Sequence, residues 1–586
     1  MYDFKVWAPR ASTMRLKLAD QELVMDGPDA MGWWKKDVEW AEFGMDYAYL
    51  VDDDATPYPD PRSMRQPNGV HGLSRLYDHR AFEWSDSQWQ CPPLTGAVIY
   101  EVHVGTFSKE GTFDGAIPHL DHLVELGITH VELMPVAEFA GNRGWGYDGV
   151  SLFAVFEPYG GPDGFKRFVA ACHARSLAVI LDVVYNHYGP VGNYSNKFGP
   201  YLTEKYQTPW GAAVNFNEGG SDQVRRFFCD NAAMWLRDYH CDGLRLDAVH
   251  EFIDRSAIRF MEQLSAEVDR LEATLGRKLS LIAESDLNDP RVVLPLEAHG
   301  YGMDAQWSDD FHHALFTLIY TKEPGRGYYD DFGKFEDLQK ALKHVFVYDG
   351  EYSPYRKHTH GRPVEGLSAH HFLGYIQNHD QIGNRALGER IEHLVGMDAA
   401  KVAMGLVMTS PFVPMLFMGE EFAASSPFQY FADHEDEEMR TLVSEGRKRD
   451  FAQFGFHEED VPDPEGMETF ERSKLVWSEV HEGKHEEMLE WTKQLIHLRR
   501  TTVALNDGDL GHLEVEIDAE KRWLVMERGS TRVMMNLGEL PASFALREKE
   551  CLKLASKAEV VVEDESVTLP AMSLAIVMLP FATTVR

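Results

Sequence analysis

Cysteine is scarce in this sequence of 586 residues. The five cysteines are odd in number, lie far apart and form no Cys-x-x-Cys pair. Disulfide frameworks and structural zinc sites need paired or closely spaced cysteines, so the sequence indicates neither. We expect mostly buried thiols in a chain long enough for a large hydrophobic core.

Positive charge is also scarce. The chain has 57 Lys and Arg residues against 94 Asp and Glu residues, which gives a formal net charge of −37 at pH 7. Nucleic acids and anionic membranes are bound through basic patches, so neither is expected as a partner. A neutral ligand rich in hydroxyl groups is compatible with this charge.

Long hydrophobic runs are missing as well. The longest apolar stretch, residues 403–419, contains Thr409, Ser410, Pro411 and Pro414 and is a poor membrane-spanning helix. The opening MYDFKVWAPR lacks the basic and apolar segments of a secretory signal. The sequence therefore predicts a cytoplasmic protein.

Patterns of apolar and polar residues divide the chain into three parts. Residues 1–92 alternate in short runs separated by Gly, Pro and Asp, which is typical of a β-sandwich. Residues 93–503 alternate strand and helix patterns, with a long inserted loop at about 187–221. Residues 504–586 return to short alternating strands and predict a second β-sandwich.

The central part predicts an α/β fold, a (β/α)8 TIM barrel. Helix patterns at 116–126, 165–175, 222–239 and 254–275 separate short apolar segments. Eight such strands in alternation with helices indicate a closed parallel barrel. An open doubly wound sheet is expected to carry a glycine-rich phosphate turn after its first strand, and none is present. The predicted strands are 97–103, 130–135, 178–186, 243–247, 279–284, 303–307, 372–378 and 413–418.

Acidic, histidine and arginine side chains gather where four of these strands end. The third strand ends in DVVYNH (182–187), the fourth in RLDAVH (245–250), the fifth in ESD (284–286) and the seventh in QNHD (377–380). Catalytic groups of such barrels lie at the carboxyl ends of the strands. One Asp at a strand end is more often a loop cap, but four sets at one barrel mouth indicate an active site.

The residue types suit glycoside hydrolysis. A retaining enzyme needs one ionised carboxylate and one protonated carboxyl group about 5–5.5 Å apart. Asp247 and Glu284, on adjacent strands, are the candidates, and Arg245 is expected to hold Asp247 ionised as the nucleophile. Glu284 is expected to be the acid/base, with a pKa raised by neighbouring carboxylates. Sugar hydroxyls would be held by Asp380, His187 and His379.

Four stretches, DVVYNH, GLRLDAVH, IAESD and YIQNHD, resemble in order and spacing the signature regions of the α-amylase superfamily, glycoside hydrolase family 13. The resemblance covers nearly the whole chain. It implies that Asp247 is the nucleophile, Glu284 the general acid/base and Asp380 the transition-state stabiliser. It also implies that Tyr147 and Asp148 contact the sugar on the non-reducing side of the cleaved bond.

A finer resemblance concerns the substrate. FKVWAPRA looks like the glucan-associated N-terminal sandwich of branching, debranching and trehalose-releasing enzymes, and YEVHVGTFSKEGTF, YQTPWGAAVNF and QNHDQIGNRALGER resemble the malto-oligosyltrehalose trehalohydrolase family. That family implies cleavage of the α-1,4 bond next to the terminal trehalose of malto-oligosyltrehalose, which a malto-oligosyltrehalose synthase makes. Many amylases have Lys-His shortly after the nucleophile, whereas His250-Glu251 here favours an unusual leaving group.

Further substrate contacts follow from the same resemblance. Residues 309–313, after the sixth strand, are expected to line the groove. Trp210 in the long third loop is a candidate stacking wall for the leaving disaccharide, or it only packs the loop. The full predicted substrate-binding set is Tyr147, Asp148, His187, Trp210, Arg245, Leu246, Ala248, Val249, His250, Glu251, Asp286, Asp309, Asp310, Phe311, His312, His313, His379, Gln381, Ile382, Gly383 and Asn384.

No cofactor and no metal is predicted. The Asp and His residues of 309–313 match no familiar ligand motif, and Asn186 resembles one ligand of the amylase calcium site without the others. The expected state is a monomer or a homodimer. The rival functions are a 1,4-α-glucan branching enzyme, a debranching hydrolase and a non-catalytic glucan-binding protein, and the intact set of acidic residues disfavours the last.

Overall fold

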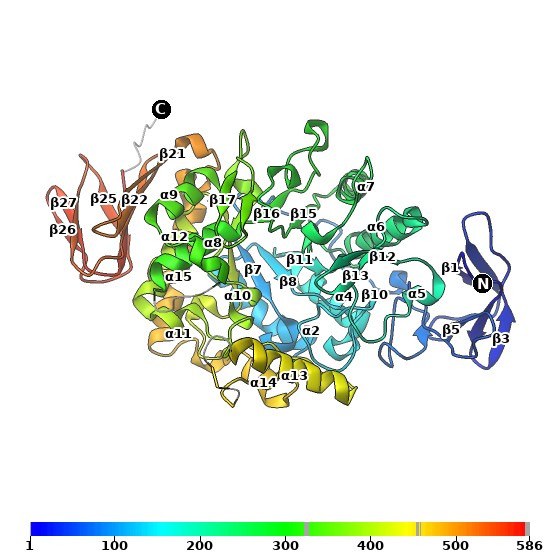
Figure 1. Cartoon of the computed structure of the whole chain (residues 1–586). Helices are drawn as coiled ribbons and strands as arrows, with labels where there is room; N and C mark the ends of the chain where they lie inside the picture. Colours follow the sequence, from blue (N-terminus) through cyan, green and yellow to red (C-terminus); the bar gives the residue numbers. More distant parts are fainter. Residues whose placement is uncertain (1, 322–326, 453–455, 458, 580–586) are drawn as a thin grey trace.

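Eight short parallel strands close into a barrel at the centre of the molecule (Figure 1). The computed structural model describes residues 2–321, 327–452, 456–457 and 459–579. Each predicted barrel strand contains one observed strand, so the predicted (β/α)8 barrel is confirmed. The strands are β7 (Ile99–Val102), β8 (His130–Leu133), β11 (Ala178–Val183), β14 (Gly243–Leu246), β15 (Ser280–Ala283), β16 (Ala305–Trp307), β19 (Phe372–Gly374) and β20 (Val413–Phe417).

The barrel strands are buried along their whole length because helices cover them outside and side chains fill them inside. Ile99, Ile180, Ile282, Leu373 and Met415 come from five different strands and form one buried cluster. Such a cluster is the filled interior of a barrel, which is a packed core and not a pore. The continuous apolar runs in the sequence follow from this two-sided burial.

Helices surround the barrel, and they include α3 (Leu120–Leu126), α4 (Gly161–His173), α6 (Ser221–Arg237), α7 (Phe260–Leu275), α12 (Met397–Thr409) and α15 (Lys484–Thr501). The helix predicted at 254–275 begins only at Phe260. The side chain of Asp254 accepts hydrogen bonds from the backbone N–H of Phe260 (2.7 Å) and from Arg225 (2.5 Å). An Asp that binds a backbone N–H at the start of a helix lies outside the helix, which explains the later start.

Two small sheets form the N-terminal part. β1 (Tyr2–Trp7) pairs with β4 (Trp33–Val38), and the second sheet has the order β3 (Gln21–Val24), β2 (Met14–Leu18), β5 (Asp46–Val51) and β6 (Ser74–Arg75). Buried and half-buried positions alternate along β2, as in a strand with one face against a core. This part lies at one end of the molecule, and the last strands of the chain lie at the other (Figure 1).

The C-terminal part also has two sheets. β21 (Leu513–Asp518), β22 (Trp523–Arg528), β23 (Thr531–Asn536), β28 (Ser573–Met578) and β25 (Cys551–Ala555) form one, and β24 (Ala542–Ala545), β27 (Ser566–Leu569) and β26 (Val561–Glu563) form the other. The flanking β-domains agree with the prediction, but the apolar pattern predicts strands there only at 513–517, 523–527, 532–536, 560–562 and 573–579, so it misses β24, β25 and β27. These strands are short and mostly half-exposed, so their apolar pattern is weak. The predicted domain limits stay predictions.

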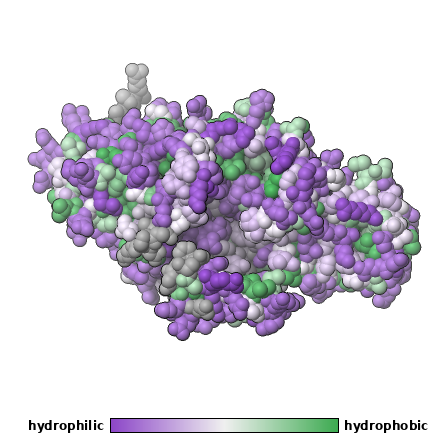
Figure 2. Space-filling view, in the orientation of Figure 1, coloured by the Kyte–Doolittle hydropathy of each residue, from purple (hydrophilic) through white to green (hydrophobic). Residues whose placement is uncertain are grey.

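Several segments extend beyond the carboxyl ends of the barrel strands. The long third loop holds α5 (Ser195–Phe198) and a hairpin of β12 (Leu202–Thr208) and β13 (Gly211–Val214). Between β16 and β19 lie α8 (Asp309–Ile319) and a hairpin of β17 (Glu351–Ser353) and β18 (His358–His360). A hollow opens over the barrel on the face that Figure 2 shows. In the described parts of the chain, no helix has the length and apolar character that crossing a bilayer requires.

Candidate active site

The barrel interior changes from apolar to polar toward the carboxyl ends of the strands. Two residues beyond Ile99 and Ile180 come Glu101 and Asp182, whose side chains point to the same side because strand side chains alternate. Glu101 is paired with Glu132 on the next strand, and Asp182 with Arg245. All four of these ionisable residues are buried. This polar layer supports the residues that follow at the barrel mouth.

Arg245 is the centre of the site and binds three carboxylates. Its Nη1 donates to Oδ2 of Asp182 (2.5 Å) and to Oδ1 of Asp247 (3.0 Å), and its Nη2 donates to Oε2 of Glu284 (2.7 Å). The guanidinium carbon lies 4.1 Å from the centre of the Trp307 ring, which suits a cation–π contact. The predicted contact between Arg245 and Asp247 is therefore present, and Arg245 also links Asp247 to Glu284.

Asp247 follows β14 directly and is held through both carboxylate oxygens. Arg245 binds Oδ1, and the Nδ2 of Asn186 donates to Oδ2 (2.7 Å) and to the Asp247 carbonyl oxygen (2.9 Å). Burial raises the pKa of Asp247, while the charge of Arg245 and the Asn186 hydrogen bond act in the opposite direction. The two bonds fix the orientation of the carboxylate.

Glu284 follows β15, next to β14 in the barrel. Its Oε2 accepts hydrogen bonds from Arg245 and from the backbone N–H of Ala248 (2.9 Å). Ala248 reaches this position with a φ of 38°, in the left-handed region. The direct contacts of Glu284 are Arg245 and a backbone N–H, because adjacent strands end side by side. The carboxylates of Asp309 and Asp380 also interact electrostatically with Glu284, and the predicted raised pKa of Glu284 stays a prediction.

Asp380 and His379 begin α10 (His379–Gly383) after β19. The Nε2 of His379 lies 2.8 Å from the hydroxyl oxygen of Tyr147 and 3.5 Å from Oδ1 of Asp380. The Tyr147 ring stacks on the His379 ring with centroids 5.1 Å apart, and its hydroxyl donates to Asp182 (2.7 Å). Three segments distant in sequence, those of Tyr147, Arg245 and His379, thus meet at one point.

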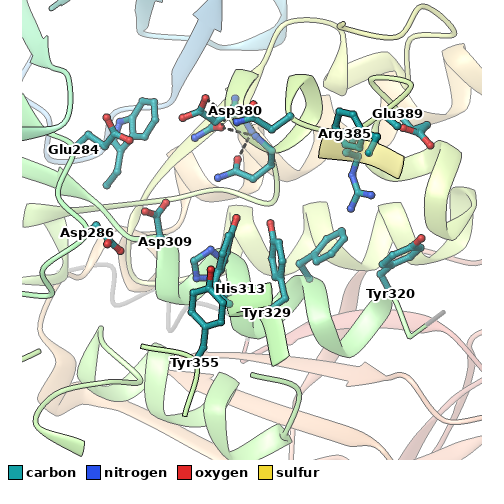
Figure 3. Close-up of a pocket in the computed structure, with 18 of the residues that line it drawn as sticks. Glu284, Asp286, Asp309, His313, Tyr320, Tyr329, Tyr355, Asp380, Arg385 and Glu389 are labelled. Carbon is teal, nitrogen blue, oxygen red and sulfur yellow. Dashed lines mark hydrogen bonds between the residues drawn. The ribbon is translucent and has the colours of Figure 1, made fainter. Parts of the chain in front are cut away.

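A cavity of about 690 Å³ opens beside Glu284 and Asp380. Figure 3 shows that these two acidic residues face the cavity together with Asp286 and Asp309, opposite a row of rings that includes His313, Tyr329 and Tyr355. Polar groups and ring faces in one cavity are the features that bind a sugar. The predicted site residues that line it are His250, Glu284, Asp286, Asp309, His313, Asp380, Gln381 and Asn384.

Residues 309–313, which were predicted to line the groove, lie in α8, and only some of them face the cavity. Asp309 and His313, four residues apart on one helix face, line the cavity. Asp310 points elsewhere, since it accepts hydrogen bonds from the backbone of Val347 (2.7 Å) and Tyr348 (3.0 Å). Phe311 is fully buried, and His312 binds the carbonyl of Ile376.

Other predicted residues also lie away from the cavity. Leu246, Ala248, Val249 and Ile382 are buried in the packing around the barrel mouth, and Glu251 does not line the cavity. A Cβ on Gly383 would lie 2.0 Å from the Trp145 ring, so this position needs a glycine. Tyr147, Asp148 and His187 lie around Asp182 and Asn186 at the end of β11, outside the cavity lining.

Trp210 lies in the turn of the β12–β13 hairpin, and half of its surface is exposed. Its ring stacks on His187 with centroids 4.6 Å apart and an interplanar angle of 12°. Burial lowers the pKa of His187 to about 4, so the imidazole is neutral at pH 7. Trp210 therefore packs on the site and still offers an open ring surface.

The sequence motifs did not predict most of the aromatic wall of the cavity or the cations beside it. Tyr328, Tyr329, Tyr355, Arg356 and Arg385 line the cavity. Arg356, on the β17–β18 hairpin, donates to Oδ2 of Asp286 (2.9 Å) and orients it. The signal available was the repeated tyrosine in GYYDD and EYSPYR between the sixth and seventh barrel strands.

Among the described residues, no group of three or more His, Cys, Asp or Glu side chains has the arrangement of a metal site. Asn186, the residue that resembles an amylase calcium ligand, uses its amide N–H on Asp247 and its oxygen on His187. This residue orients the two neighbouring side chains.

Known proteins resemble the chain along its length. The family model of the α-amylase catalytic domain matches residues 76–208. The malto-oligosyltrehalose trehalohydrolase of Rhizobium sp. (strain M-11) is 46% identical over 580 residues, 98% of this chain and 97% of the relative. That of Mycobacterium tuberculosis (strain ATCC 25618 / H37Rv) is 45% identical over 582 residues, 98% of this chain and 99% of the relative.

A solved structure supports the same relationship. A Salmonella typhimurium protein assigned to the α-amylases has a TM-score of 0.89 and 34% identity, and the match covers 98% of this chain and 97% of that one. A branching enzyme is more distant: the 1,4-α-glucan branching enzyme of Bacillus caldolyticus is 28% identical over 73% of this chain and 66% of its own.

Proposed function

Because the chain belongs to the malto-oligosyltrehalose trehalohydrolase family of the α-amylases, we propose that it hydrolyses the α-1,4-glucosidic bond next to the terminal trehalose of malto-oligosyltrehalose. The products are trehalose and a shorter maltooligosaccharide. The observation that carries this proposal is identity of 46% over nearly the whole of both chains.

We assign the chemistry to three carboxylates. Asp247 attacks the anomeric carbon, and Glu284 gives its proton to the departing glycosidic oxygen, which leaves a covalent glucosyl ester on Asp247. Glu284 then takes a proton from water, whose oxygen attacks the ester and frees Asp247. Arg245 and Ala248 bind Oε2 of Glu284, so we place the transferred proton on Oε1.

We assign Asp380 to the transition state, in which positive charge develops on the sugar ring. A carboxylate next to the reacting carbon stabilises that charge more than it stabilises the ground state. Its position beside the cavity and 3.5 Å from His379 supports this role. Tyr147, Asp148 and His187 are assigned to the glucose that becomes bound to Asp247.

The leaving trehalose is assigned to the cavity beside Glu284. Its tyrosine rings offer apolar faces to the sugar rings, and Asp286, Asp309 and Arg385 offer partners for the hydroxyls. A neutral disaccharide needs no net charge from this wall, and the cavity mixes acidic and basic side chains. Trp210 is assigned as an additional stacking surface.

The cellular setting remains a proposal too. We place the enzyme in the cytoplasm, after a malto-oligosyltrehalose synthase in one pathway. We expect a monomer or a homodimer that needs no cofactor.

Product analysis tests the substrate assignment. Purified protein is incubated with maltotriosyltrehalose and, separately, with maltopentaose, and the products are separated by chromatography. We expect rapid release of trehalose from the first and little attack on the second. Comparable cleavage of both would leave only a general α-glucan hydrolase, and new α-1,6 branches in amylose would identify a branching enzyme instead.

A variant tests whether the chain is catalytic at all. Asp247→Ala removes the nucleophile and should abolish turnover, since the glucosyl ester has no acceptor. Circular dichroism should show an unchanged fold. Retained activity would contradict the mechanism, and absence of activity in both wild type and variant, with maltooligosaccharide binding intact, would support a non-catalytic glucan-binding protein.

A further inference from the structure

Glu101 is a buried carboxylate that has no role in the reaction steps proposed above. It lies on β7, inside the barrel, and is 1% exposed. Its Oε2 accepts the backbone N–H of His379 (3.0 Å), and its Oε1 binds the Nδ1 of the same histidine. One carboxylate therefore fixes both the main chain and the ring of His379.

The hydrogen-bond partners of the two ring nitrogens, Nδ1 and Nε2, indicate how many protons the His379 ring carries. The Tyr147 hydroxyl donates its proton to Asp182, so its oxygen accepts from the Nε2–H of His379. The Nδ1 faces the Glu101 carboxylate, which only accepts. Both nitrogens thus carry protons, and His379 is an imidazolium with Asp380 3.5 Å from its Nε2.

We propose that Glu101 is a positioning residue for the hydrolysis: it holds His379 as a fixed imidazolium, which in turn orients Tyr147 and keeps Asp380 ionised beside the reacting sugar. This proposal rests on the function proposed above, but it requires only that the enzyme cleaves a glycosidic bond and not that trehalose is the product. The contacts run without a gap from Glu101 through His379, Tyr147 and Asp182 to Arg245.

The electrostatics agree with the geometry. Burial lowers the pKa of His379, but the charges of Glu101 and Asp380 outweigh it and raise the pKa to about 9. The charged and titratable groups that face His379 come from several barrel strands and the loops after them; they are Glu101, His103, Glu132, Tyr147, Asp182, Arg245 and Asp380.

Glu132 provides a matched control. It lies opposite Glu101 on the neighbouring strand, it is also 1% exposed, and its pKa is raised well above the usual value by burial and by the charge of Glu101. Both effects favour the protonated, neutral form of Glu132, and in that form Glu132→Gln exchanges one neutral group for another of the same size. Glu101→Gln is the same substitution on the neighbouring strand, but it removes the negative charge that faces the His379 imidazolium.

Steady-state kinetics across pH test the proposal. We expect Glu101→Gln to lower kcat by about ten- to a hundredfold, by analogy with the loss of carboxylates that orient metal-binding histidines, with a smaller change in KM. Because His379 would lose its second proton more easily, the alkaline limb of the kcat profile should move to lower pH. Glu132→Gln should keep the wild-type profile.

A double-mutant cycle separates positioning from general damage. If Glu101 acts through His379, Glu101→Gln should add little loss to His379→Gln, because coupled residues are not additive. The proposal would be overturned if the kcat losses of the two single variants multiplied in the double variant. It would also be overturned if the alkaline limb of the kcat profile did not move in Glu101→Gln, or if it moved equally in Glu132→Gln. Each variant is measured on maltotriosyltrehalose and on maltopentaose, so a wrong substrate assignment shows in the wild type while Glu101 is still tested.

Discussion

At the scale of single residues, Arg245 has the most contacts with the proposed machinery. Its planar guanidinium binds Asp182, Asp247 and Glu284 at once and lies over the Trp307 ring. One buried cation between three carboxylates compensates part of their mutual repulsion, and its fork sets their relative positions. Orientation of the proposed nucleophile, Asp247, and of the proposed acid/base, Glu284, thus depends on the same side chain.

Arg245→Lys tests the importance of this geometry. Lysine keeps the charge but lacks the planar fork, so it cannot reach three carboxylates and stack on Trp307. We expect kcat/KM for maltotriosyltrehalose to fall by roughly a hundredfold or more, in line with the loss of a preorganised electrostatic contact. Thermal unfolding should show a retained fold. Wild-type kinetics in this variant would mean that charge alone is sufficient.

At the scale of elements, residues 76–98, here called the strap, join the N-terminal sheets to the first barrel strand, β7. His173 on α4 contacts Asp86 of the strap (2.8 Å) through Nδ1 and Asp242, just before β14, through Nε2 (2.9 Å). Trp89 of the strap stacks on the His173 ring with centroids 4.5 Å apart. Since both partners are carboxylates, the bridge is complete only while His173 carries two protons.

Because His173 titrates between Asp86 and Asp242, we expect the free energy of unfolding to depend on pH. Burial lowers the pKa of His173, but its bonds to Asp242 and Asp86 raise the pKa above the usual histidine value of 6.5. A histidine pKa that is higher in the folded state stabilises the fold below pH 6.5, and this contribution is lost as pH rises through the folded-state pKa. The free energy of unfolding should therefore decrease from pH 6.5 upward.

His173→Gln should weaken that decrease. We expect it to lower the free energy of unfolding at pH 6 by about 1–3 kcal/mol, the cost of disturbing a buried hydrogen-bonded pair, and by less at higher pH. Denaturant unfolding at several pH values measures both effects. The exposed His358 serves as control through His358→Gln, which should leave the curve unchanged. An unaltered pH dependence in His173→Gln would place the titration elsewhere.

The sequence predicts the elements that are buried on both sides. The eight barrel strands were predicted correctly because two-sided burial gives unbroken apolar runs, and the positions of Asp247 and Glu284 at the barrel mouth were predictable because each follows such a run. The aromatic wall of the cavity was missed because it comes from a loop segment whose position depends on tertiary contacts, such as the ion pair of Arg356 with Asp286.

Glu101 was missed for another reason. A glutamate within a strand usually indicates an exposed face, and its burial becomes meaningful only when His379, 278 residues away, lies against it. The available signal was its position in the apolar run VIYEVHV, where an exposed face is not expected. Local patterns identify strand ends, but they do not identify the partner of a buried charge.

At the scale of the whole molecule, the net charge of −37 leads us to expect that salt changes the stability of the fold but not the rate of catalysis. Self-repulsion destabilises the compact state, and salt screens it, with a Debye length that falls to about 10 Å at 0.1 M. We therefore expect the Tm at pH 7 to rise between about 0.02 M and about 0.5 M NaCl as the screening length shortens. Near pH 5, close to the isoelectric point of about 5.1, this rise should nearly vanish.

Salt should leave catalysis largely unaffected at pH 7. A neutral oligosaccharide is not steered by the protein field, so kcat/KM for maltotriosyltrehalose should stay within about twofold over the same salt range. The ion contacts of Arg245 are buried, and buried pairs are screened much less than exposed ones, so the site geometry should also persist. Initial rates at low substrate concentration measure kcat/KM directly. A steep dependence on salt would mean that screening disturbs the site itself and would contradict the expected persistence of the buried ion contacts. A rise in Tm with constant kcat/KM would show that the negative surface affects the stability of the fold and not the recognition of the sugar.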